Sequence, residues 1–166
     1  MNHTAFIGLG SNLSNPSEQV LQAMQAIGRL PETRLLACSS LYRSAPVGFL
    51  EQPDFINAVV KIETRLAPLE LLKSLLALEQ ENGRTREFQN APRTLDLDVL
   101  LYDDLQHHEH GLTVPHPHMH KRAFVLQPLL EIAPDCMIPA VGAAAGAMQL
   151  CLDQQLERLP NEDGLK

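Results

Sequence analysis

The sequence has no tryptophan and few other aromatic side chains, with five phenylalanines and two tyrosines among 166 residues. Any aromatic contact with a ligand must therefore come from a short set of residues. Cysteine is also rare: the three cysteines, Cys38, Cys136 and Cys151, lie far apart and form no C-x-x-C motif. This spacing disfavours a structural zinc site or a disulfide framework and favours a reducing compartment, so we expect a cytoplasmic protein.

Basic residues are in the minority, with 13 Lys and Arg against 20 Asp and Glu, and the formal net charge is -7. A protein that binds nucleic acid through its phosphates needs a basic surface, so we expect no nucleic-acid partner. Apolar runs fall well short of the roughly 20 residues of a membrane-spanning helix, and no signal-peptide pattern opens the sequence, so we expect no membrane contact. Nothing indicates an obligate interface, and we expect a monomer with one domain over residues 1–166.

Hydrophobic periodicity predicts a regular series of elements. Strands are expected at 4–10, 33–44, 55–64 and 94–102, and helices at 15–28, with Asn15 as its N-cap, and at 67–83. The order strand, helix, strand, strand, helix, strand is typical of an α+β, ferredoxin-like fold, in which an antiparallel sheet carries helices on one face. The remaining sequence is less regular: 103–119 resembles a loop, and 120–134 and 140–159 resemble helices.

Two aspartates interrupt the apolar strand TLDLDVLLY (94–102). Because side chains alternate across a strand, Leu95, Leu97 and Val99 are expected to point into the core, while Asp96 and Asp98 share the other face. Carboxylates this close repel each other unless they are protonated or bridged by a cation, and Mg²⁺ typically takes one or two carboxylates together with phosphate oxygens. The alternative is an ordinary half-exposed strand, where apolar and acidic residues commonly alternate.

Three arginines, Arg84, Arg86 and Arg93, precede this acidic pair closely in the sequence. Arginine binds phosphate through a planar fork of donors, and in an acidic chain such a group favours a phosphate site over simple ion pairing with neighbouring acids. A second group of candidate phosphate ligands follows at His116, Lys121 and Arg122. Metal ions and arginines are what phosphoryl transfer requires, because its catalysis consists mainly of positioning and charge neutralisation.

Six of the seven histidines lie between residues 107 and 120. A zinc site built from them would need a further acid or cysteine ligand, and no such residue is placed for that role. Solvated histidines with adventitious metal binding are therefore the simpler interpretation of this segment.

Six segments occur in order along the chain: GLGSNL, SSLYRSAPVG, QPDFINAVV, GRTRE, PRTLDLDVLLY and LTVPHPHMHKRAFVLQPL. Together they resemble the 6-hydroxymethyl-7,8-dihydropterin pyrophosphokinase family over about residues 5–134. The resemblance implies a ferredoxin-like enzyme of folate biosynthesis that transfers the β,γ-pyrophosphoryl group of ATP to the hydroxymethyl dihydropterin and releases AMP. It also implies that Asp96 and Asp98 hold two Mg²⁺ ions, with ATP as co-substrate.

The resemblance also assigns residues to the two substrates. Asn57 would bind the edge of the pterin, and Phe55 and Phe124 would stack on its faces, although both phenylalanines also suit a core. Backbone groups and a wall would come from Ser44, Ala45, Pro46, Val47 and Gly48. ATP would be bound by Leu72, Glu79, Arg84, Arg86, Arg93, Val99, Leu112, Thr113, His116 and Arg122, with Glu79 on the ribose. The catalytic set would be Arg84, Arg93, Asp96 and Asp98.

Three positions depart from the family pattern: Asn90 stands where a tryptophan is expected, Pro117 where an aromatic residue is expected, and Gly111 where a basic residue is expected. These changes bear on closure of the polar segment 84–92 and on nucleotide affinity. Two other functions fit the same residues, namely a γ-phosphoryl or nucleotidyl transferase and a non-catalytic binding module of the same fold. The nucleotide product and the Mg²⁺ dependence of ATP binding discriminate among them.

Overall fold

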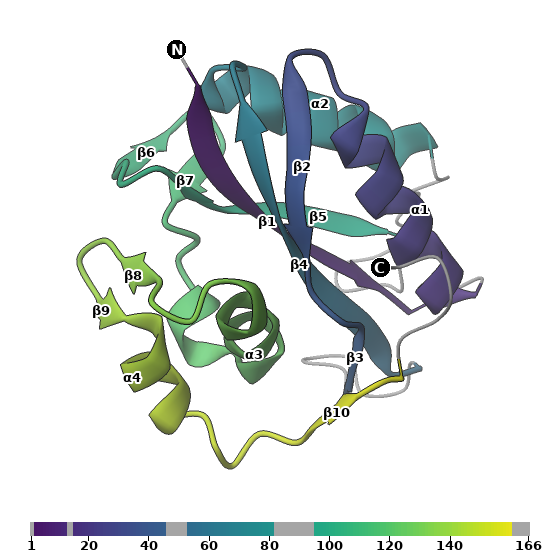
Figure 1. The fold of residues 1–166 in the computed structure, drawn as a ribbon, viewed down its shortest axis with the longest axis vertical. Helices are drawn as coiled ribbons and strands as arrows, with labels where there is room; N and C mark the ends of the chain where they lie inside the picture. The colour runs from purple at the N-terminus through teal and green to yellow at the C-terminus, as the bar shows by residue number, and fades with distance from the viewer. Residues whose placement is uncertain (1, 13–14, 46–52, 82–94, 161–166) are drawn as a thin grey trace.

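A central antiparallel sheet organises the computed structural model, which describes residues 2–12, 15–45, 53–81 and 95–160 (Figure 1). The sheet is six-stranded. Its strands are β1 (His3–Ser11), β2 (Thr33–Cys38), β3 (Tyr42–Ser44), β4 (Phe55–Thr64), β5 (Asp96–Tyr102) and β10 (Leu156–Arg158). The four strands predicted from the sequence are therefore present, and β10 is an addition from the C-terminal region.

The hydrogen-bonded order is β10-β3-β4-β1-β5, and β2 pairs with β4 beyond the end of β3. Strands β2 and β3 are the two parts of the strand predicted at 33–44. They are separated at Ser39, whose backbone N–H donates to the Val59 carbonyl and whose Oγ accepts from the Val59 N–H, both at 2.9 Å. A side-chain oxygen thus replaces one backbone acceptor, and the strand is displaced there. With β2 and β3 counted together, the order is ferredoxin-like, and the predicted fold class is confirmed.

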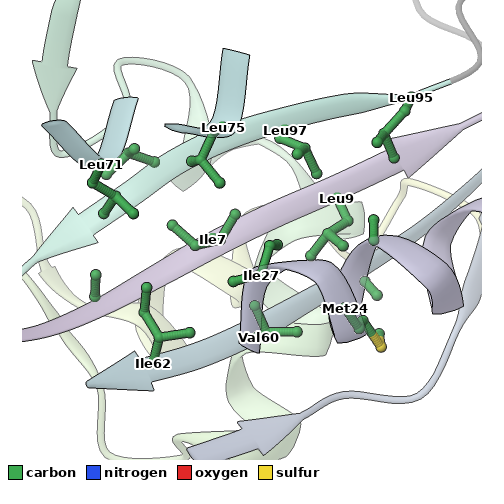
Figure 2. Packing of buried hydrophobic residues seen from close by; sticks show 14 of the residues in the cluster. Ile7, Leu9, Met24, Ile27, Val60, Ile62, Leu71, Leu75, Leu95 and Leu97 are labelled. Atoms are coloured by element: carbon green, nitrogen blue, oxygen red, sulfur yellow. The ribbon is translucent and has the colours of Figure 1, made fainter. Parts of the chain in front are cut away.

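Helices α1 (Pro16–Gly28) and α2 (Pro68–Glu81) cover one face of the sheet (Figure 1). Strand side chains at alternate positions meet both helices and form the larger hydrophobic core, as Figure 2 shows. The helical side of this core comes from Val20, Ala23, Met24, Ile27, Leu71 and Leu75. Strand β4 is buried on both of its faces from Ile56 to Val60, which explains why this stretch contains so many apolar residues in succession.

The opposite face is covered over part of its area. Helix α3 (Ala123–Ile132), the short helix α4 (Ala144–Gln149) and the hairpin of β8 (Met137–Ile138) and β9 (Gly142–Ala143) form a second layer there (Figure 1). Their side chains join Phe6, Val59 and Leu100 in a second core, which includes Leu126 and Leu129 at 0% exposure. None of the helices in the described segments is long and apolar enough to cross a membrane.

Several local predictions need correction. Asn15 has a left-handed backbone (φ 60°) and makes no side-chain capping bond, so the predicted N-cap interaction is wrong; its carbonyl accepts the Gln19 N–H instead. Residues 140–159 do not form one long helix, because α4 ends at Gln149 and β10 follows.

The segment predicted as a loop at 103–119 contains a hairpin of β6 (His107–Glu109) and β7 (Leu112–Val114), followed by a 3-10 turn, η1 (Met119–Lys121). Its two turn residues, His110 and Gly111, have φ angles of 56° and 81°. Positive φ at both central positions is typical of the two-residue turn whose twist matches paired strands. The hairpin was not predicted because the segment is rich in histidine and only one of its two turn residues, Gly111, is typical of a turn.

Candidate active site

Asp96 and Asp98 lie on the face of β5 that points away from α1 and α2. Leu95, Leu97 and Val99 alternate with them and are packed into the larger core, as Figure 2 shows for the two leucines. Both aspartates are half-buried. The predicted alternation is therefore confirmed, and two carboxylates share the partly covered side of the sheet.

Two glycines face the acidic pair from the neighbouring strand. In the sheet register Asp96 lies opposite Gly10 and Asp98 lies opposite Gly8. A Cβ atom at Gly10 would stand 3.3 Å from Oδ1 of Asn57, and one at Gly8 would stand 3.3 Å from the side chain of Leu100. The two glycines thus leave room for the side chains of Asn57 and Leu100, which lie close to the strand there. Glycine inside a strand signals such a close approach, but no role was predicted for the glycines of GLGSNL.

A buried polar pair continues the same face on β4. Asn57 lies opposite Gly10 and is 5% exposed, and its Nδ2 donates to Oγ of Ser44 at 2.7 Å. Phe55 lies two residues earlier on the same face, is half-buried, and is in register with Ser44. Ala45, the residue after Ser44, is exposed. Four residues that the resemblance assigned to the pterin are therefore neighbours.

The segment after the β6–β7 hairpin brings basic groups toward the acidic pair. The His116 N–H donates to the Leu100 carbonyl at 2.9 Å, which fixes this segment to β5. Burial lowers the pKa of His116 to about 4, the positive charge of Arg122 and His118 adds to this, and Asp96 opposes it. His116 is therefore neutral at pH 7. His116 thus interacts electrostatically with both Arg122 and Asp96, while the role of the three residues in binding phosphate stays a prediction.

Arg122 and Phe124 lie where the segment after the β6–β7 hairpin joins α3. The guanidinium of Arg122 lies 5.5 Å from the centroid of the Phe124 ring, a distance at which a cation interacts favourably with an aromatic face. Phe124 is half-buried, at the first turn of α3. Its ring therefore remains partly accessible at the boundary of the second core, where a planar ligand can reach it.

Four residues assigned to the nucleotide occupy a different environment. Val99 and Leu112 are buried at 4% and 3% exposure in the larger core, and Leu72 of α2 packs against the same core. Thr113 is half-buried, and its Oγ1 lies 2.8 Å from Nδ1 of His108 within the hairpin. The contact of these residues with ATP stays a prediction.

Glu79 is a buried carboxylate, at 2% exposure, near the end of α2. Its Oε2 accepts a hydrogen bond of 2.7 Å from the backbone N–H of Leu97, the residue between the two aspartates. This bond joins the end of α2 to β5, the edge strand of the sheet. No pattern in the sequence predicts this contact. The ribose contact expected for Glu79 stays a prediction.

Residues Pro46, Val47 and Gly48 of the pterin set and Arg84, Arg86 and Arg93 of the phosphate set lie outside the described residues. Their predicted roles are therefore not tested. All seven histidines are described, and in the described parts of the chain no group of three or more His, Cys, Asp or Glu side chains is arranged to hold a metal ion.

Comparison with known proteins decides the family. The model of the 7,8-dihydro-6-hydroxymethylpterin-pyrophosphokinase (HPPK) family matches residues 6–134. The chain belongs to the HPPK family. It is 48% identical over 155 residues to a 2-amino-4-hydroxy-6-hydroxymethyldihydropteridine pyrophosphokinase of Pseudomonas aeruginosa, covering 93% of this chain and 96% of that protein. The corresponding enzyme of Haemophilus influenzae is 51% identical over 136 residues, with coverage of 82% and 85%.

Solved structures show the same fold at low sequence identity. The Plasmodium falciparum HPPK-DHPS, crystallised with pterin and p-hydroxybenzoate, aligns with a TM-score of 0.71 at 13% identity. The alignment covers 90% of this chain and 43% of that one, so the chain spans less than half the length of the solved protein. The sequence-based interpretation of the chain as a diphosphokinase of folate synthesis is confirmed by the family and its relatives.

HPPK enzymes use ATP and Mg²⁺, and the acidic pair suits that cation. Mg²⁺ prefers oxygen ligands and usually keeps water and substrate phosphate oxygens beside one or two carboxylates. Asp96 and Asp98 supply two carboxylates on one strand face, and Gly8 and Gly10, which lie opposite them, add no side chain of their own. The residues therefore fit a metal completed by a triphosphate rather than a closed protein cage.

Proposed function

We propose that this chain transfers the β,γ-pyrophosphoryl group of ATP to 6-hydroxymethyl-7,8-dihydropterin, giving the pterin diphosphate and AMP, as a cytoplasmic, single-domain monomer. The observation that carries this proposal is the row formed by Asn57, Gly10 and Asp96 across three adjacent strands. A residue suited to the pterin edge and a residue suited to a metal–triphosphate complex are thus separated by one glycine. This arrangement holds the hydroxymethyl group and the phosphates in one place, and such positioning is the main source of rate in phosphoryl transfer.

On the pterin side, we assign Asn57 to the polar edge of the ring. Its Nδ2 is already bonded to Ser44, which fixes the orientation of the amide and directs Oδ1 toward Gly10. Phe55 and Phe124 provide the two faces for stacking, from β4 and α3 respectively. Ala45 and the segment 46–48 complete the wall.

On the triphosphate side, we assign Asp96 and Asp98 to two Mg²⁺ ions. When bound, these ions neutralise charge on the phosphate oxygens and lower the barrier to displacement at the β-phosphorus. Arg84, Arg86 and Arg93 bind the phosphates together with Arg122. The imidazole of His116 is neutral, and its ring N–H serves as a hydrogen-bond donor to the phosphates. Leu72, Val99, Leu112, Thr113 and Glu79 form the adenosine side, with Glu79 also holding β5.

The nucleotide product tests this function directly. The protein is incubated with ATP, Mg²⁺ and 6-hydroxymethyl-7,8-dihydropterin, and the nucleotides are separated by anion-exchange chromatography. We expect AMP in equal amount to the pterin diphosphate. ADP would instead indicate γ-phosphoryl transfer, and pyrophosphate would indicate nucleotidyl transfer. ATP left intact, with Mg²⁺-independent nucleotide binding in calorimetry, would support a non-catalytic module.

A further inference from the structure

A partly buried polar cluster lies away from the acidic pair, at the junction of α3 with the β2–β3 connection. The carboxylate of Glu131, near the end of α3, has only 22% of its side chain exposed. Its Oε1 accepts hydrogen bonds from the Ser40 N–H at 2.9 Å and from the Tyr42 hydroxyl at 2.8 Å. Its Oε2 accepts from the Ser40 hydroxyl at 2.8 Å. One carboxylate therefore holds the segment that leads into β3.

Arg158 completes the cluster from the C-terminal strand. Its Nη2 donates to Oε2 of Glu131 and its Nε donates to Oγ of Ser40, each at 3.1 Å. Burial tends to raise the pKa of Glu131, but hydrogen bonds from Ser40 and Tyr42 and the charge of Arg158 together hold that pKa below its ordinary value. The carboxylate is therefore ionised at neutral pH and carries several charge-assisted bonds, which are the stronger class of hydrogen bond.

The cluster joins the elements that carry the proposed pterin residues. Tyr42 is in register with Asn57 across β3 and β4, and it lies two residues before Ser44. Glu131 lies seven residues after Phe124 on the same helix, α3. Movement of Glu131 relative to Tyr42 therefore changes the spacing between Phe124 on one side and Asn57 with Ser44 on the other.

Strand β10 also reaches the pterin side of the sheet. It pairs with β3, with Leu156 opposite Ser44, and Figure 1 shows it along the outer edge of β3. Ser44 and Ala45 line one side of an open groove of about 590 Å³, and residues 154–157 line the other. This strand lies beyond residue 134, where the family match ends.

We propose that Glu131 and Arg158 are positioning residues for the pterin site, which set the distance between α3 and β3 and thereby the fit of the ring between Phe124 and Asn57. The proposal rests on the pterin roles assigned above. Helix α3 does not depend on this cluster for docking, because Leu126 and Leu129 are fully buried in the second core. Loss of the cluster should therefore shift the helix rather than unfold the protein.

The test compares Glu131→Gln and Arg158→Gln with the wild-type enzyme. We expect each to raise the KM for the pterin by about fivefold to tenfold, while the affinity for an ATP analogue with Mg²⁺ changes by less than about twofold. Arg158→Lys should restore part of the pterin affinity, since it keeps the charge but loses the two-pronged donor geometry. Calorimetric titration with the pterin alone measures the same effect without turnover.

Arg34→Gln provides the matched control. It removes an arginine from an ion pair with Glu63 at 2.9 Å on the same sheet, but Arg34 is exposed and on β2, away from the cluster. Its pterin affinity should equal that of the wild type within about twofold. Unchanged pterin binding in Arg158→Gln and Glu131→Gln, or equal losses for pterin and nucleotide, would overturn the positioning role. An absence of AMP formation by the wild-type enzyme would instead overturn the proposed function, and the pterin titration would still report on the cluster.

Discussion

The two faces of the sheet differ in what they bury. The face under α1 and α2 is a continuous apolar layer from Val60 through Ile7 to Leu97 (Figure 2). The opposite face carries the second core beneath α3 and α4, and beside it Asn57, Asp96 and two glycines. The same strands serve both faces, because alternate residues point in opposite directions. Both faces therefore bury apolar side chains, and the polar residues occupy the part of the second face that its own core does not include.

The largest effect should come from the polar face. Asp98→Ala should lower turnover by at least about 10³-fold, equivalent to about 4 kcal/mol in the activation barrier, because a metal ligand is lost. Thermal unfolding should change little, since Asp98 is not part of the apolar layer. Turnover is measured together with Mn²⁺ binding by electron paramagnetic resonance, which should also weaken. Asp104→Ala, which alters an exposed acid in the turn after β5, is the control and should retain both. Near-normal turnover in Asp98→Ala would remove the metal assignment.

The next largest effect should come from the apolar face. There a substitution should lower stability and leave turnover almost unchanged, the opposite of what is expected for Asp98→Ala. Leu75→Ala removes a side chain that is 1% exposed, so it should lower the free energy of unfolding by about 2–5 kcal/mol. Below the unfolding transition its kcat should stay close to the wild-type value, because Leu75 does not reach the substrate face. Leu76→Ala, at a neighbouring position with 41% exposure, should cost less than about 0.5 kcal/mol. Urea titrations of the three proteins measure these differences; equal losses in both variants would contradict the assigned layering.

The smallest effect should come from Glu131, at the junction of α3 with the β2–β3 connection. The pKa of Glu131 is lowered in the folded state, so its charge stabilises the fold at neutral pH and this contribution is lost as the pH falls below the ordinary value of 4.5. The difference in melting temperature between wild type and Glu131→Gln should therefore be constant at neutral pH and shrink on acidification. Melting curves recorded from about pH 7.5 to about pH 3.5 measure this. A difference that stays constant or grows at low pH would show that the carboxylate is not the stabilising group.

Periodicity in the sequence was sufficient for the strands and helices of the central unit. The strand predicted at 55–64 coincides with β4, and the alternation around Asp96 placed the acids on the correct face. Short local signals were less reliable. Asn15 has the residue type of an N-cap, but its left-handed backbone directs the side chain elsewhere, and the alanine-rich stretch near the C-terminus forms only a six-residue helix.

The sequence supplied candidate site residues but not the contacts among them. Asn57 and Ser44 were both expected near the pterin, yet their mutual hydrogen bond depends on the pairing of β3 with β4. Glu79 was expected at the ribose, and its hydrogen bond to the Leu97 amide is a further contact that was not predicted. Such contacts join residues far apart in the chain, and a periodic pattern carries no information about them.

By itself, the sequence determined which residues of the central unit face inward, the order of its strands and helices from β1 to β5, the acidic pair and, through its motifs, the family. These properties follow from neighbouring residues, since side-chain alternation and helical spacing are local. Only the tertiary structure decided that β10 pairs with β3, that Arg158 meets Glu131, and that Gly10 separates Asn57 from Asp96. Those contacts depend on how packed layers bring distant segments together, and the free energy that selects them comes from burial of the whole core rather than from any short stretch of chain.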